Sequence, residues 1–324
     1  MVPAKDTIEI IVPVFNEEAC LDELVRRLLA LKDRMADVDA RVVFVNDGST
    51  DATLPKLAAC AARFPFVRVL DFSRNFGHQI AVTAGLDHAD ADYVAIIDAD
   101  LQDPPELIEE MYRRAKDSGA DIVYGKRLTR KSETWFKKAT ARTFYRVINA
   151  MCDIEIPADT GDFRLVSRRV LAAMQSMREK HRFLRGMIPW VGFTSEPFLY
   201  HRDERYAGKT KYPMKRMVKF ALDAIFSFSN TPIRLATYTG LATVAFGILG
   251  GLLLLYLRLF TSYTIPGTTA VILTVILLGG IQIFMLGIIG EYIGRIFEEA
   301  KKRPLYIVKS SLNFGVAAGS SRNG

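Results

Sequence analysis

Cysteine and histidine are scarce in this chain, and neither is arranged for chemistry. Its 324 residues include three cysteines and four histidines. Cys20, Cys60 and Cys152 are odd in number, widely spaced and without a CxxC pair, and the histidines include no ligand-like pair. We therefore expect neither disulfide bonds nor a zinc site.

Other familiar signals are also missing. No glycine-rich GxGxxG motif follows the first apolar run, which argues against a dinucleotide-binding dehydrogenase. That run, residues 8–15, is too short for a secretory signal and leads into Asn16, Glu17 and Glu18, so we expect no signal peptide. The formal charge is +7, but no nucleic-acid-binding module is recognisable and the basic residues gather near two apolar segments. We expect a membrane rather than a nucleic-acid partner.

The two apolar segments contain no charged residue at all. They are residues 235–257 and 265–290. At about 1.5 Å per helical residue, each is longer than the roughly 30 Å hydrocarbon core of a bilayer. Basic residues flank the pair on its outer sides, so the positive-inside rule predicts two transmembrane helices with both chain termini in the cytoplasm. The alternative is a pair of buried core helices, which is uncommon for neighbouring stretches of this length.

Short apolar runs alternate with helical patterns over residues 8–127, which is typical of a mostly parallel sheet covered on both faces. The predicted strands are residues 8–14, 41–45, 67–70, 93–97 and 121–124. The predicted helices include residues 18–34, 77–88 and 105–116. The fold class is therefore α/β and Rossmann-like, and such sheets bind ligands at the C-terminal ends of their strands.

The most informative stretch is YVAIIDADLQDPPE, residues 93–106. Asp98 and Asp100 emerge at the end of a buried strand, and Gln102 follows. Carboxylate and amide oxygens suit Mg²⁺ or Mn²⁺, which usually also contact a substrate's phosphates. The alternative is a solvated turn, with Asp103 as a helix N-cap and the two prolines in the first turn.

The turns after the first two strands add polar groups at the same edge. They read PVFNEE and VNDGSTD. Glu17 and Asp47 are placed to accept hydrogen bonds from a base or a sugar. Alternatively, each is only a cap or turn residue, since Asp47 and Gly48 form a common turn dipeptide. Three acidic strand ends that converge on one edge favour a shared ligand.

Six motifs followed by two apolar spans resemble the family-2 glycosyltransferases that load sugars onto polyprenyl phosphate: PVFNE, VNDGS, DADLQDPPE, YGKR, TGDFRL and RYAGKTKY. Within that group the chain is most similar to the bacterial bactoprenol glucosyltransferases, and more distantly to the dolichyl-phosphate mannose synthases. The resemblance implies a GT-A fold, a nucleotide-sugar donor, a divalent metal (Mg²⁺ or Mn²⁺) and inversion of the anomeric centre.

The resemblance also implies roles for individual residues. Nucleotide-sugar binding falls to Pro13, Phe15, Glu17, Val45, Asp47, Asp98, Ala99 and Asp100. The metal falls to Asp100 and Gln102. The donor diphosphate and the acceptor phosphate fall to Arg127, Arg164, Arg205 and Lys211. The catalytic residues are then Asp98, Asp100, Arg127 and Arg164. Asn46 stands where many relatives carry a second aspartate, which leaves the base of the nucleotide open.

A lipid phosphate acceptor needs no strong base, because a phosphate monoester is already anionic at neutral pH. It needs positioning and charge neutralisation instead. Asp98 and Asp162 are the candidates for a base by analogy with sugar transfer to hydroxyl groups, and we expect neither to act as one. Inversion would then give a β-linked sugar from an α-linked donor.

The chain divides into four predicted parts. These are a catalytic domain (1–213), a juxtamembrane amphipathic helix (214–233), a two-helix transmembrane domain (234–295) and a cytosolic tail (296–324) with a short strand and a disordered end. Residues 135–151 are a further candidate for an interfacial helix, or else an ordinary amphipathic core helix. Residues 303–309 are predicted to form the tail strand, with the edge of another chain's sheet as its partner. We expect a homo-oligomer, and the resemblance implies a tetramer.

The expected reaction is transfer of glucose from UDP-glucose to undecaprenyl phosphate at the cytoplasmic face of a bacterial inner membrane, for cell-surface glycan modification such as that of O-antigen. One alternative is a polyprenyl-phosphate mannose synthase that uses GDP-mannose. Another is a non-enzymatic membrane module that supports a flippase, which would tolerate loss of the acidic cluster. A processive polysaccharide synthase is disfavoured because the QxxRW motif is absent.

Overall fold

A computed structural model describes residues 5–128, 160–203, 229, 231–260 and 267–314. One eight-stranded sheet with the order β7-β5-β6-β4-β1-β2-β3-β8 lies at the centre of the N-terminal domain. The strands are β1 (Thr7–Val14), β2 (Asp39–Asn46), β3 (Val67–Phe72), β4 (Tyr93–Ile96), β5 (Ile122–Arg127), β6 (Thr160–Ser167), β7 (Ser195–Tyr200) and β8 (Val308–Leu312).

All strands except β6 and β8 run in one direction. β1 pairs in parallel with β2 and β4, β2 with β3, and β5 with β7. β6 is antiparallel to both β4 and β5, and β8 is antiparallel to β3. The C-terminal ends of the parallel strands and the N-terminal end of β6 therefore meet at one side of the sheet, which we call the carboxyl edge.

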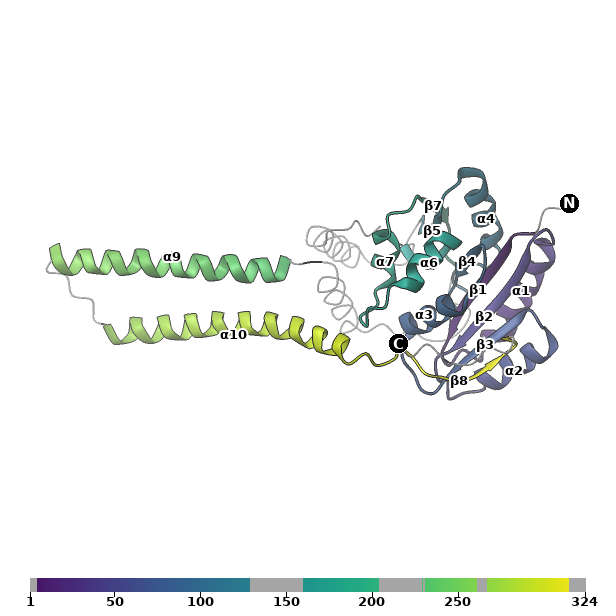
Figure 1. The fold of residues 1–324 in the computed structure, drawn as a ribbon, viewed down its shortest axis with the longest axis horizontal. Helices are drawn as coiled ribbons and strands as arrows, with labels where there is room; N and C mark the ends of the chain where they lie inside the picture. The colour runs from purple at the N-terminus through teal and green to yellow at the C-terminus, as the bar shows by residue number, and fades with distance from the viewer. Residues whose placement is uncertain (1–4, 129–159, 204–228, 230, 261–266, 315–324) are drawn as a thin grey trace.

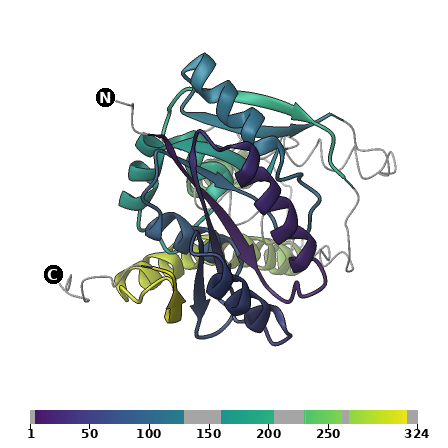
Figure 2. The ribbon, with the colours of Figure 1, turned by 90° about the vertical axis from the view of Figure 1, so that its right-hand side faces the viewer.

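Helices cover both faces of the sheet (Figures 1 and 2). They are α1 (Leu21–Arg34), α2 (Thr53–Arg63), α3 (His78–His88), α4 (Leu107–Ser118), α6 (Arg168–Ser176) and α7 (Leu184–Trp190). Ile10 and Val12 of β1 pack with α1, α2 and α4, whereas Ile11 packs with α3, α6 and α7. This alternation along a strand gives the predicted three-layer α/β architecture.

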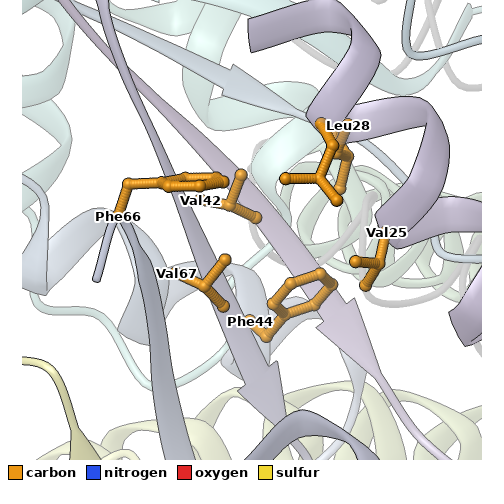
Figure 3. A pocket seen from close by; sticks show the side chains of 7 residues that line it. Val25, Leu28, Val42, Phe44, Phe66 and Val67 are labelled. Atoms are coloured by element: carbon orange, nitrogen blue, oxygen red, sulfur yellow. The ribbon is translucent and has the colours of Figure 1, made fainter. Parts of the chain in front are cut away.

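The sequence pattern of α1 shows why these helices form. Leu21, Leu24, Leu28 and Leu31 recur at helical spacing and are buried against the sheet. Acidic residues lie in the first turn and basic residues in the last, which suits the helix dipole. A small hollow lies between this helix, β2 and the start of β3 (Figure 3). It is lined only by apolar side chains, including Val25. With no polar group it is a packing defect of the core rather than a ligand site.

The five predicted strands and the three predicted helices are confirmed, with ends shifted by a few residues. Two elements that complete the carboxyl edge, β6 and β7, were not predicted. The predicted interfacial helices at 135–151 and 214–233 fall largely or wholly outside the described residues.

Two long helices, α9 (Thr231–Phe260) and α10 (Gly267–Ala300), run side by side and project away from the N-terminal domain (Figure 1). Their segments Thr231–Leu257 and Thr274–Ala300 are long and apolar enough to cross a membrane, and no part of the apolar window in either is buried. The pattern of two candidate spans is thus confirmed, and their exposure argues against buried core helices. Helix α10 continues past the predicted boundary at residue 295.

After α10 the chain returns to the sheet. The tail strand is β8, slightly later than predicted, and its partner is β3 of the same chain rather than another chain's edge. The ring of Tyr306 stacks on Phe72 with centroids 5.3 Å apart, and its hydroxyl donates to Asp87 over 3.0 Å. The side-chain amide of Asn313 donates to one carbonyl of α2 and one of β3, over 2.7 and 2.8 Å. The chain is therefore fixed to the domain on both sides of β8.

Candidate active site

The carboxyl edge carries most of the residues that sequence analysis singled out. After β1 come Phe15 and Glu17, after β2 comes Asp47, and after β4 come Asp98, Asp100 and Gln102. Arg127 ends β5, and Arg164 lies in β6. The buried members of the set include Pro13, Val45 and Ala99. Arg205 and Lys211 lie outside the described residues. The topology thus places donor-side and phosphate-side candidates together.

Asp47 is engaged in holding the start of α3. Its carboxylate accepts hydrogen bonds from the backbone N–H groups of Phe76 (2.6 Å) and Gly77 (2.9 Å). Burial raises the pKa of Asp47, and these two bonds oppose that effect. The neighbouring Gly48 has φ +67°, and a Cβ there would lie 2.6 Å from the backbone of Arg74. The turns after β2 and β3 therefore touch, and a base contact from Asp47 would use the remaining lone pairs.

Asn46 has a structural reason to differ from aspartate. Its side-chain amide donates to Asp71 over 2.7 Å, and both side chains are buried. An aspartate at this position would place two buried carboxylates against each other, which is unfavourable without a shared proton.

The DAD loop, residues 98–103, carries the predicted metal ligands. The backbone N–H of Gln102 donates to Asp100 over 3.1 Å, and the carbonyl of Gln102 accepts from the N–H of Asp203 over 2.9 Å. Leu101 has φ +59°, a conformation that costs on the order of 1–3 kcal/mol in a non-glycine residue, and its side chain is buried. Strain held by packing is typical of functional loops, and the carboxylate and amide oxygens fit a hard divalent cation.

Asp103 at the end of this loop does not cap a helix. α4 begins only at Leu107, with Glu106 at the N-cap position and no side-chain cap. Asp103 is instead fully buried and accepts a hydrogen bond from the Tyr200 hydroxyl. The alternative interpretation of this aspartate as an N-cap was therefore wrong.

Four ionisable side chains form a network at the start of the DAD loop: His78, Asp98, Asp162 and Arg185. His78 Nε2 lies 3.1 Å from Asp162 Oδ2 and 3.5 Å from Asp98 Oδ1. Arg185 donates to both oxygens of Asp162, over 2.8 and 3.1 Å. His78 begins α3 and Arg185 lies on α7, so the network joins two helices to β6 and to the end of β4. Sequence analysis missed both His78 and Arg185.

The charged groups of this network shift one another's pKa values. Burial alone would lower the pKa of His78, but the hydrogen bond with Asp162 and the charge of Asp98 raise it to about 9. Burial alone would raise the pKa of Asp162, but the Arg185 guanidinium and His78 hold it well below its usual value. Burial raises the pKa of Asp98 to about 6 despite the opposing charge of His78.

The same side chains resemble a metal site in outline. His78, Asp98 and Asp162 each offer a ligand atom within 4.8 Å of the others. Both oxygens of Asp162 already accept hydrogen bonds from Arg185, however, and one of them also lies 3.1 Å from His78. We interpret this trio as part of an ion-pair network rather than as the metal site.

His78 should make the stability of the metal-free protein depend on pH. Its pKa of about 9 in the folded state lies above the ordinary 6.5, so its contribution is complete below pH 6.5 and is lost as pH rises through 9. We expect the melting temperature of the wild type to fall over this interval relative to that of His78→Gln. Thermal unfolding measured at several pH values with a chelator present checks this.

The control for this experiment is His88→Gln. His88 lies at the other end of α3, and its ring contacts the carbonyl of Ala84 rather than a carboxylate. This variant should keep the wild-type pH dependence. An unchanged pH dependence in His78→Gln would show that the His78–Asp162 pair does not contribute to stability.

Two arginines meet at Gly161. Arg164 is 4% exposed and donates to the Gly161 carbonyl over 2.8 Å. Burial lowers the pKa of Arg164 to about 10, which still leaves it charged at neutral pH. A guanidinium nitrogen of Arg127 lies 2.8 Å from the position that a Cβ on Gly161 would take. The glycine thus lets the Arg127 guanidinium approach the backbone next to Asp162, where Arg164 also donates.

The chain is similar to known glycosyltransferases over most of its length. Residues 9–174 match the family Glycosyl transferase family 2, and residues 231–296 match the family GtrB C-terminal hairpin. The chain is 50% identical over 302 residues to the uncharacterized glycosyltransferase YkcC of Bacillus subtilis, covering 93% of both chains. It is 41% identical to the uncharacterized glycosyltransferase sll0501 of Synechocystis sp., covering 93% of this chain and 94% of the other. It is 38% identical to the prophage bactoprenol glucosyl transferase homolog of Escherichia coli, covering 93% and 98%.

Among solved structures, glucosyl-3-phosphoglycerate synthase from Mycobacterium tuberculosis, in complex with Mn²⁺, UDP-glucose and phosphoglyceric acid, aligns with 68% of this chain and 78% of its own. The identity is 17% and the TM-score 0.45.

Proposed function

Because the chain belongs to glycosyl transferase family 2, we propose that it transfers glucose from UDP-glucose to undecaprenyl phosphate. The observation that carries this proposal is the meeting of Arg127 and Arg164 at Gly161, at the same edge as the DAD loop. Cations suited to binding phosphate and oxygen ligands suited to a hard metal would thus be combined in one site. The E. coli relative is named a bactoprenol glucosyl transferase homolog, which supports the sugar and the lipid.

The donor half of the site follows from the DAD loop. Asp98, Ala99 and the turns after β1 and β2 would bind the nucleoside and the sugar. A divalent cation held by Asp100 and Gln102, either Mg²⁺ or Mn²⁺, would supply neutralisation of the charge that develops on the leaving diphosphate.

The acceptor half follows from the arginines. Arg127 and Arg164 would hold the lipid phosphate so that its oxygen attacks the anomeric carbon from the side opposite the leaving group. Because that phosphate is already anionic, no side chain has to remove a proton. Asp162 would be a poor base in any case, since its pKa lies well below the ordinary value. The product would be a β-linked polyprenyl-phosphate sugar for cell-surface glycan modification.

The membrane setting would bring the lipid to the site. The two candidate spans precede the tail strand that returns to the sheet, and residues 231–296 match the GtrB C-terminal hairpin. We propose an inner-membrane location with the catalytic domain and both termini in the cytoplasm. A homo-oligomer, tetrameric as the family resemblance implies, stays a prediction.

The test is nucleotide release by the detergent-purified full-length protein. It would be incubated with Mg²⁺ or Mn²⁺ and a panel of nucleotide sugars, with and without undecaprenyl phosphate. We expect UDP release from UDP-glucose only when the lipid is present, and loss of that release in Asp100→Ala. Release from another donor alone would overturn the assignment of glucose as the sugar. Release without the lipid would overturn the assignment of undecaprenyl phosphate as the acceptor. No release from folded protein would overturn the proposed reaction.

A further inference from the structure

Tyr200 lies between the DAD loop and Arg127. It ends β7 and is the register partner of Arg127, which ends β5. Its ring packs edge-to-face on Phe163, with centroids 5.5 Å apart. Both rings cover Gly125, where a Cβ would lie only 2.9 Å from each of them. The ring is therefore fixed by packing on the strand next to Arg127, and the direction of its hydroxyl is fixed with it.

The hydroxyl of Tyr200 lies between a carboxylate, that of Asp103, and the strand that carries the Arg127 guanidinium. It donates its proton to Oδ1 of Asp103, which also accepts from Arg202 Nε over 3.1 Å. Arg127 is the cross-strand neighbour of Tyr200, and its charge opposes the rise in the pKa of this hydroxyl. Burial and the charge of Asp103 raise the pKa of Tyr200, so the phenol stays protonated. With its proton directed at Asp103, the oxygen keeps lone pairs that can accept a hydrogen bond from the neighbouring guanidinium.

Two buried atoms of this cluster have no partner among the described residues. They are Oδ2 of Asp103 and Nε of Arg127. Asp103 itself has no exposed surface, so this arrangement costs stability relative to a fully paired one. Stability given up in a buried polar cluster is more typical of a functional arrangement than of simple packing.

The cluster also touches the predicted metal ligands. Asp103 directly follows Gln102 in the chain, and the Gln102 carbonyl accepts a hydrogen bond from the backbone of Asp203, just beyond β7. At its far end, Arg127 reaches Gly161 beside Arg164. A continuous set of contacts thus runs from the DAD loop through Tyr200 to the arginine pair.

We propose that Tyr200 and Asp103 are positioning residues that aim the Arg127 guanidinium at a phosphate group of the substrates. This inference rests on the proposed function, because it takes Arg127 to bind either the donor diphosphate or the lipid phosphate. Tyr200 touches no substrate in this account. It fixes one side of Arg127, and the close approach to Gly161 fixes the other.

The first test is Tyr200→Phe, which removes the hydroxyl and keeps the ring. We expect kcat/KM for one phosphate-bearing substrate to fall by about 10- to 100-fold, the size of effect that a small misplacement of a binding group produces. The matched control is Tyr112→Phe. Tyr112 is also buried and donates to a carboxylate, that of Asp6, over 2.7 Å, but at the opposite end of the sheet. It should lose stability and keep wild-type kinetics.

A double-mutant cycle decides whether Tyr200 acts through Arg127. In an Arg127→Ala background, adding Tyr200→Phe should change kcat/KM by less than about two-fold, because there is no longer an arginine to aim. Asp103→Asn, added to the same Arg127→Ala background, should likewise change kcat/KM by less than about two-fold. A Tyr200→Phe effect as large in the Arg127→Ala background as in the wild type would overturn the proposal. So would equal kinetic losses in Tyr200→Phe and Tyr112→Phe.

The kinetic constants identify which phosphate is involved. A higher KM for undecaprenyl phosphate would assign Arg127 to the acceptor, and a higher KM for UDP-glucose would assign it to the donor. If the wild type releases no UDP in response to the lipid, the proposed function fails, and the same cycle can be run on the affinity for UDP with Mn²⁺ by calorimetry. Coupling between Tyr200 and Arg127 in UDP affinity would still support the positioning role, and its absence there would overturn it.

Discussion

An Arg164→Gln variant is expected to transfer sugar about 10³-fold more slowly than the wild type, the loss seen when a fixed charge that stabilises a transition state is removed. Arg164 is the more buried of the two arginines at Gly161, at 4% exposure. A buried cation interacts with a phosphate through little intervening water, so its effect exceeds that of a surface lysine. Glutamine removes the charge and keeps an amide donor on a shorter side chain. The measurement is kcat/KM at saturating metal, with thermal unfolding in parallel.

Arg169→Gln is the matched control for Arg164. Arg169 lies on α6 and pairs with Asp121 over 3.2 Å, just before β5 begins and therefore away from the carboxyl edge. It should retain activity within about two-fold, as expected for an exposed ion pair. If folded Arg164→Gln kept more than a tenth of the wild-type activity, Arg164 would not be the cation that the reaction depends on.

Asp162→Asn is expected to weaken donor and acceptor binding together, by about 100-fold in kcat/KM, rather than to abolish a proton transfer. Asp162 balances Arg185 and His78, and removing its charge leaves two partly buried cations next to each other without their shared anion. The held-down pKa of Asp162 makes it a structural anion and not a base. The loss should therefore appear mainly as raised KM values. Steady-state kinetics with each substrate varied in turn separates KM from kcat.

Asp90→Asn serves as the control, because Asp90 pairs with Arg168 on the surface over 3.0 Å. It should change neither constant. A different result for Asp162→Asn is informative as well. If kcat collapsed while both substrates still bound normally, the lipid phosphate would need a general base after all.

The fold was largely predictable because its strands are buried on both faces and read as apolar runs. The apolar runs at residues 8–15 and 93–97 are both followed directly by polar residues. The parallel topology brings the ends of such strands together. β6 gave no such signal, since TGDFRLVS mixes charged and apolar residues. Its antiparallel insertion between β4 and β5 is what places Asp162 beside Asp98, and local patterns cannot reveal that.

The parts of the site that were missed depend on tertiary contacts. His78 follows the turn after β3, so topology alone would have placed it at the carboxyl edge, but histidines were weighed only as metal ligands. Arg185 lies on a short helix with an internal proline, and nothing in its neighbourhood singles it out. The alternative interpretation of Asp103 as a helix cap rested on the two prolines that follow it. Its real partner, Tyr200, is 97 residues further along the chain.

The tail strand changes how the domain is mounted. β7 and β8 are the two outermost strands of the sheet, and the chain passes from one to the other by way of the α9–α10 hairpin (Figure 1). At its C-terminal end the hairpin is joined to β8 by residues 301–307 alone, and Tyr306 within this link stacks on Phe72. A connection this short limits how far the domain can rotate about the hairpin axis. An enzyme that meets a headgroup at a fixed height above a bilayer gains from such a mount.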